Sequence, residues 1–123
     1  MTVRVATVLS ARDWEPGLVA LARDSAAVQI VVRAYQPADI DAHIDGGDVI
    51  VAGGDVSWVT PSYIEQWRRQ GVGVVGVVPA GDVPATHLME MGGADEVVPD
   101  NIDLAALIQA IRFVVPQVVE QAA

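Results

Sequence analysis

The sequence GVVGVV occupies residues 73–78, and it is apolar without a polar break. A short run of this kind, rich in β-branched Val, is typical of a strand that is covered on both faces of a sheet. Four further runs share this Val- and Ile-rich composition, at residues 3–9, 29–33, 49–52 and 96–98. Strands covered on both faces are a feature of parallel sheets, because helices pack on either side of them.

Helical patterns lie between the five runs. Thr60 can cap a helix and Pro61 suits its first turn, while Asp103 can cap the last helix. We expect helices at residues 16–24 and 37–44, from Thr60–Pro61 to Gly71, from Val83–Pro84 to Gly92–Gly93, and from Asp103 through Val115. This alternation predicts an α/β fold, a three-layer (βα)5 sandwich with the flavodoxin-like parallel strand order 2-1-3-4-5.

The length of 123 residues suits one compact domain, which we place at residues 1–115. Pro116 is expected to break or kink the last helix, because proline lacks the N–H that a helix interior uses. Residues 116–123 are then a C-terminal extension or the start of a linker, and the chain is interpreted as the N-terminal part of a longer protein.

Composition excludes several classes of function. With 52% apolar and 19% charged residues the chain should fold, and with no cysteine it has no disulfide, thiolate metal site or cysteine nucleophile. The net charge of −9 disfavours nucleic acid and anionic membranes as direct partners. Residues 1–10 carry no secretory leader and no apolar run is long enough to span a membrane, so a cytoplasmic location without membrane insertion is expected.

Lysine is absent from the whole chain. All seven basic residues are arginine: Arg4, Arg12, Arg23, Arg33, Arg68, Arg69 and Arg112. Any mechanism that needs a compact ammonium group is therefore excluded.

Three aspartates follow predicted strands, at positions where ligands bind in parallel sheets. Asp13, Asp55 and Asp82 could together offer oxygen ligands to Mg²⁺. Each could instead cap a turn or a helix start, where Asp is favoured, and we favour capping. No metal and no other cofactor is therefore predicted.

The glycine pairs and the histidines carry weaker signals. Gly46–Gly47 and Gly53–Gly54 fit no phosphate-binding motif, so we expect Gly46 to end a helix and Gly53 to allow a tight turn. Residues 41–46, DAHIDG, match the DxHxxG pattern of cobalamin-binding domains, but His43 falls on the second helix instead of following the first strand. His87 has no Ser–Asp partnership nearby in the sequence. No catalytic residue and no cofactor site is assigned.

A family resemblance is carried by residues 93–104, GADEVVPDNIDL. This stretch resembles the GADDYLTKPFDL segment of response-regulator receiver domains, in which the GAD turn leads into the fifth strand. The spacing of all five strands agrees with that family, so the resemblance extends over nearly the whole chain.

The same alignment shows that the residues for phosphotransfer are replaced. Receivers hold Mg²⁺ with an acidic pair after the first strand, where this chain has Ser10, Ala11, Arg12 and Asp13. The position of their phosphoacceptor aspartate is taken by Ala52 or Gly53, with Asp55 beyond it. Val78 and Pro79 replace the Ser or Thr that ends the fourth strand, and Asp100 replaces the lysine that neutralises the acyl phosphate.

Degenerate receivers occur as N-terminal domains of MinD/ParA-class ATPases, and the chain looks like those of the TadZ/CpaE type of pilus-assembly proteins and of related septum-site proteins. The lysine-free composition suits a high-GC bacterium. The resemblance implies a non-enzymatic domain for protein interaction, dimerisation or localisation to a cell pole or septum. Two alternatives stay open: a small-ligand sensor at the strand tips, or a residual phospho-receiver that uses Asp55.

Surplus apolar residues suggest where such a domain would bind. Receivers commonly pair through helix four, strand five and helix five, and we expect self-association through this surface, with Arg112 beside Asp95, Glu96 or Asp100 of a second copy. Ala105 and Val114 belong to the same surplus. Trp58 is either a binding hot spot or a cover for the sheet edge. The candidate interface residues are Leu88, Met89, Met91, Ala106, Arg112, Phe113 and Trp58.

Overall fold

The computed structural model describes residues 2–10 and 12–122, with side chains described up to Val115. A five-stranded sheet with the order β2-β1-β3-β4-β5 forms its centre, and every strand pair is parallel. The strands are β1 (Val3–Val8), β2 (Val28–Ala34), β3 (Val49–Gly53), β4 (Gly73–Val78) and β5 (Glu96–Pro99). The predicted α/β fold and strand order are confirmed.

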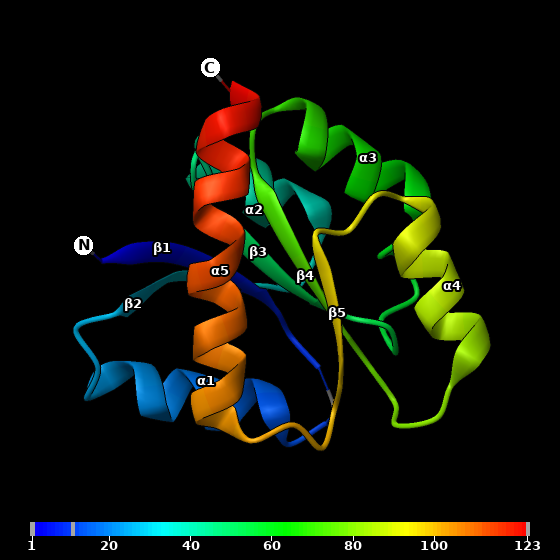
Figure 1. Cartoon of the computed structure of the whole chain (residues 1–123), viewed down its shortest axis with the longest axis horizontal. Coiled ribbons are helices and arrows are strands. Elements are labelled where there is room, and N and C mark those ends of the chain that lie inside the picture. The colour runs from blue at the N-terminus through cyan, green and yellow to red at the C-terminus, as the bar shows by residue number, and fades with distance from the viewer. Residues whose placement is uncertain (1, 11, 123) are drawn as a thin grey trace.

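Helices cover both faces of the sheet (Figure 1). Their bounds are α1 (Trp14–Arg23), α2 (Pro37–His43), α3 (Pro61–Arg69), α4 (Val83–Met91) and α5 (Leu104–Ala122). Helices α1 and α5 pack on one face, and α2, α3 and α4 pack on the other.

Two apolar cores result, one on each side of the sheet. Along β3, Val49 and Val51 enter the core beneath α1 and α5, while Ile50 and Ala52 enter the core beneath α2, α3 and α4. This alternation follows from the two-residue period of a strand, and it explains why β3 is apolar at every position.

Two helix boundaries differ from the expectation. Helix α1 begins at Trp14, two residues before Pro16, because a proline in the first turn removes an N–H that has no partner within the helix anyway. Helix α5 does not end at Pro116 but continues to Ala122. A proline at position 116 removes one helical hydrogen bond, the one to the carbonyl of Arg112. Arg112 lies on the exposed side of the helix, where water can bind this carbonyl instead.

The hydropathy of the helices was compared with that of membrane-spanning segments over the described part of the chain. None of the helices in it combines the length and the apolar character that a bilayer-spanning segment requires.

Candidate functional site

The carboxyl ends of the strands form the edge at which receiver chemistry would lie. Ser10 follows β1, and its Oγ donates to Asp55 Oδ2 at 2.9 Å, just beyond β3. Asp100 follows β5, where its Oδ1 accepts from the backbone N of Ala80 at 3.2 Å. Ser10, Asp55 and Asp100 come from segments far apart in the chain and meet at one edge of the sheet.

An ion pair with reversed charges crosses this edge. Arg12 Nε lies 3.9 Å from Asp100 Oδ2, with the two side chains 53% and 19% exposed. Arg12 occupies the region of the receivers' acidic pair, and Asp100 occupies the position of their lysine. In the alignment that the receiver resemblance implies, the positive and negative positions are exchanged, which is the opposite of what an acyl phosphate with bound Mg²⁺ needs. Ala11, also in that region, lies outside the described residues.

Gly53 sits at the tip of β3 and is, with Ala52, one of the two positions where the receiver resemblance places the phosphoacceptor aspartate. A Cβ at this position would lie 2.5 Å from Asp55 Oδ1 and 3.3 Å from Cζ2 of Trp14. The buried Trp14 ring and the Asp55 carboxylate thus fill the space beside the strand tip. The tight turn expected at Gly53 is present, because the backbone N of Val56 donates to the Gly53 carbonyl at 3.3 Å. Gly53 has no positive φ, so close approach of Asp55 and Trp14, and not the turn, accounts for the glycine.

The expected helix stop at Gly46 is wrong. Helix α2 ends at His43, with Ile44 as its C-cap in an extended conformation. Gly47, not Gly46, has the positive φ of 92°. The turn before β3 therefore needs a glycine one residue later than expected.

The three candidate metal ligands have separate roles. Asp82 caps α4 by accepting from the backbone N of Ala85 at 3.0 Å, as the capping interpretation predicts. Asp13 stands at the N-cap position of α1 but accepts no capping bond, and Asp55 binds Ser10. Pro79 precedes α4 in a turn, where its carbonyl accepts from Asp82 N at 3.0 Å. Over residues 2–10 and 12–122, no three His, Cys, Asp or Glu side chains are grouped as a metal site.

His43 lies away from this edge. It is the last residue of α2, it is exposed, and its Nδ1 is 2.9 Å from the carbonyl oxygen of Asp39 in the same helix. His87 is exposed on α4.

Glu15 carries a buried carboxylate that the sequence patterns did not predict. Glu15 of α1 is fully buried, accepts from Thr7 Oγ1 at 2.7 Å and from Arg33 Nε at 2.9 Å, and also contacts Arg33 Nη2. The hydrogen bond to Glu15 is the main cause that raises the pKa of Arg33. A polar Thr7 within the apolar first strand was the only signal in the sequence.

At the opposite end of the sheet, the aspartate of the GAD turn is buried. Asp95 accepts from the backbone N of Val74 at 2.9 Å and pairs with Arg68 Nη2 at 3.0 Å. Burial raises the pKa of the Asp95 carboxyl, while the Val74 bond and the Arg68 charge act against that rise. The turn therefore links the start of β4 to the start of β5 and to α3.

The candidate interface residues differ in burial and in location. Met89 is 2% exposed and packs against Gly76 of β4, so its assignment to an interface is wrong. Val114 is buried as well, because it faces the core beneath α5. Leu88 lines a groove between α3 and α4 with Val59 and Pro61, away from Phe113.

The remaining candidates are exposed or half-buried. Met91, Ala106, Arg112 and Phe113 are exposed, and Phe113 and Arg112 line a hollow of about 700 Å³ with Glu96. Trp58 is half-buried: its Nε1 donates to the carbonyl of Tyr35 at 3.1 Å and its ring packs edge-on against Trp67. Of its two interpretations, the structure agrees with a cover over the sheet edge.

The three acidic residues expected beside Arg112 of a second copy lie in different surroundings. Asp95 is buried against Arg68, and Asp100 is paired with Arg12. Glu96 lies at the hollow beside Arg112, so it is the best placed of the three expected rim partners.

Comparison with solved structures places the fold among known ones. The signal receiver domain of the response regulator NarL from Mycobacterium tuberculosis is similar, with a TM-score of 0.76 at 17% identity over 91% of this chain and 94% of that one. A response regulator from Thermotoga maritima has a TM-score of 0.72 at 13% identity over 94% of this chain and 99% of that one.

A third similar structure is a protein from Burkholderia pseudomallei described as pilus assembly-related. Its TM-score is 0.62 at 18% identity, over 95% of this chain and 91% of that one. No protein-family model and no curated protein sequence matches this chain. At these identities the likeness shows the fold alone: the chain has the flavodoxin-like fold of response-regulator receiver domains.

Proposed function

We propose that this chain is a non-catalytic receiver-like domain that acts by binding proteins and accepts no phosphoryl group. The observation that carries the proposal is the ion pair of Arg12 with Asp100, in which the charges of the receiver site are exchanged. Phosphoryl transfer depends on cations placed around the transferred group, and here the position of the lysine holds a carboxylate.

Two further contacts support the loss of phosphotransfer. The Asp55 carboxylate already accepts from Ser10, and it lies beyond the strand tip instead of at it. At the tip itself, Gly53 has no side chain, and Asp55 and Trp14 occupy the space that one would need. An aspartate could enter only if Asp55 moved.

The surface of α5 around Phe113 supports self-association within the receivers' usual α4–β5–α5 face. Phe113 is 60% exposed at the hollow that Glu96, Gln109 and Arg112 also line. Because Arg112 and Glu96 flank the same hollow, a twofold axis beside Phe113 would set each Arg112 against the Glu96 of the second copy. The net charge of −9 opposes association, so pairing should tighten as salt screens the repulsion.

Light scattering of Phe113→Asp tests this proposal. The unmodified domain should show a dimer at high protein concentration and moderate salt, and Phe113→Asp should give a folded monomer with an unchanged circular dichroism spectrum. Tyr35→Asp is the matched control, because Tyr35 is also an exposed aromatic residue but follows β2 at the far edge of the sheet. A domain that is monomeric before any substitution would refute self-association.

We further propose that the domain belongs to a MinD/ParA-class ATPase of the TadZ/CpaE type, acts in the cytoplasm and is recruited to a cell pole or septum. The sequence resemblance supports this context, and so does the similarity to the pilus assembly-related protein from Burkholderia pseudomallei. The test is the reading frame downstream of residue 123. A GxxxxGK[ST] motif between a strand and a helix there is the expected result, and an unrelated domain would refute the context.

A further inference from the structure

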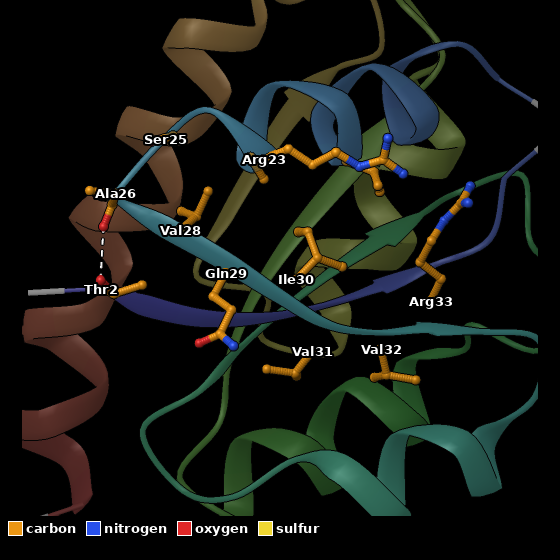
Figure 2. Close-up of a pocket in the computed structure, with 12 residues that line it drawn as sticks. Thr2, Arg23, Ser25, Ala26, Val28, Gln29, Ile30, Val31, Val32 and Arg33 are labelled. Atoms are coloured by element: carbon orange, nitrogen blue, oxygen red, sulfur yellow. Dashed lines mark hydrogen bonds between the residues drawn. The ribbon is translucent and has the colours of Figure 1, made fainter.

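An open groove runs along β2, at the edge of the sheet. It lies between β2 and α1 and has a volume of about 600 Å³, within the range of ligand sites. Figure 2 shows Val28 and Ile30 on the α1 side of β2, and Gln29, Val31 and Val32 on the other side. Ile30, Val31 and Val32 are each half-buried, so the strand presents apolar surface that the domain itself does not cover.

The free edge of β2 offers backbone hydrogen-bonding groups. β2 pairs with β1 on one side, and among the described residues no strand pairs with its other side. Val5 pairs with Ile30 and Ala6 with Val32, which leaves Val31 as an extra residue in a bulge. A strand that joined this edge would therefore form two short ladders on either side of Val31.

The charge of the groove is opposite to that of the whole chain. Among the described residues that line it, Arg23 and Arg33 are the only charged ones, in a protein of net charge −9. Arg23 forms no ion pair within the described residues. Figure 2 shows both side chains extending toward the end of the groove where β2 ends.

Arg33 is held in place from inside the domain. The buried Glu15 binds its Nε and Nη2, which leaves Nη1 without a partner among the described residues. An arginine that is fixed in this way loses little side-chain entropy when it binds a further acceptor. Arg23 supplies the uncompensated positive charge, and Arg33 supplies an oriented donor.

We propose that this groove binds an acidic, extended segment of another protein, which joins the free edge of β2 and places carboxylates at Arg23 and Arg33. Strand addition supplies backbone hydrogen bonds, and side chains supply specificity. A second copy of the chain fits less well, because its β2 sequence VQIVVRA carries no carboxylate and its net charge is also −9. The groove is separate from the surface around Phe113. A negative result for self-association would therefore leave this proposal unaffected, and the reverse also holds.

The experiment is a selection from a display library of random peptides of about twelve residues, long enough for one strand. We expect the enriched peptides to be rich in Asp and Glu, to contain β-branched residues and to lack proline. The most enriched peptide should shift the amide resonances of residues 28–34 of the whole domain. Its affinity should fall at least about tenfold for Arg23→Glu, since a lost close charge pair typically costs this much.

Arg69→Glu is the matched control, because Arg69 is exposed on α3, away from the groove, and should leave the affinity unchanged. A version of the peptide with prolines at alternate positions keeps its charge and should lose binding, because proline cannot donate to a ladder. The absence of enrichment would mean that Arg33 and the bulge only protect the strand edge, and would overturn the proposal. Enrichment of neutral or basic peptides, amide shifts elsewhere, or β2-dependent pairing of the domain with itself would overturn it as well.

Discussion

The two ends of the sheet use charged residues in different ways. At the carboxyl ends of the strands, exposed Arg12 and half-buried Asp100 form a long pair at 3.9 Å. At the amino ends, the side chain of Asp95 is 3% exposed, pairs with Arg68 at 3.0 Å and also accepts from the backbone N of Val74. The amino-end pair is buried and also holds the backbone of β4, whereas the Arg12–Asp100 pair lies at the surface.

This difference fits the proposal that the fold persists without the receiver chemistry. Exposed pairs contribute about 0–1 kcal/mol, so the residues at the carboxyl ends could be exchanged at little cost in stability. Breaking a buried and hydrogen-bonded pair costs several times more. The GAD turn therefore remains recognisable in the sequence, while the acidic pair, the phosphoacceptor and the lysine do not.

The largest effect is expected from Asp95→Ala. The substitution leaves the Val74 N–H without its acceptor and Arg68 without its ion pair to Asp95, so the free energy of unfolding should fall by about 3 kcal/mol. Urea denaturation measures it, and Asp55→Ala at the other end is the control, with an expected loss below about 1 kcal/mol. Equal losses for the two substitutions would remove the contrast between the ends.

A smaller effect should appear in the pH dependence of Asp95→Asn. Because the folded pKa of Asp95 is raised, the folded state takes up a proton before the unfolded state does as the pH falls. The unmodified protein should therefore gain stability relative to Asp95→Asn as the pH falls through this raised pKa, and the gain should be complete below the ordinary carboxyl pKa of about 4. A relative loss of stability on acidification would show that the Arg68 pair outweighs the burial of the carboxylate.

At the strand tips, Gly53→Ala should cost only about 1 kcal/mol, because the new methyl group meets the mobile end of the Asp55 side chain. The Asp55 carboxylate should move and release Ser10, which NMR of the Ser10 and Asp55 backbone amides would detect. Gly76→Ala is the matched control within the sheet: its methyl group would meet the buried Met89 and should cost more. A larger loss of stability for Gly53→Ala than for Gly76→Ala would show that the tip of β3 does not tolerate a side chain.

The smallest effect is expected for the charge-reversed pair itself. Arg12→Gln and Asp100→Asn should each change stability by less than about 0.5 kcal/mol, and a double-mutant cycle should give a similarly small coupling that decreases with salt. A coupling above about 2 kcal/mol would mean that the pair stabilises the domain as the buried pair does.

Sequence patterns predicted the fold well, because they depend on the backbone and on apolar periodicity. The Val-rich runs determine both the strands and the two cores, and β3 and β4 were recognised within one residue. The meeting of Ser10, Asp55 and Asp100 at one edge followed from the strand order. Exposure was harder to predict: Met89 and Leu88 are neighbours on α4, yet the helix turns one toward β4 and the other toward α3.

The buried contacts of Glu15 and Asp95 could not be predicted. Each depends on a side chain from a distant element, Arg33 in one case and Arg68 in the other, and no local pattern encodes such a pairing. The groove along β2 was missed for a similar reason, since Arg23 and Arg33 come together only when α1 packs beside the edge strand.

Incubation of the domain with acetyl phosphate and Mg²⁺, followed by intact-mass measurement, tests the central claim most directly. A receiver domain with the complete phosphotransfer residues is the positive control under the same conditions. The charge-reversed strand tips predict no phosphoryl adduct, and no amide shifts when beryllofluoride is added. A stable adduct that disappears in Asp55→Asn would contradict the account, because Asp55 would then act as a phosphoacceptor despite the exchanged charges around it.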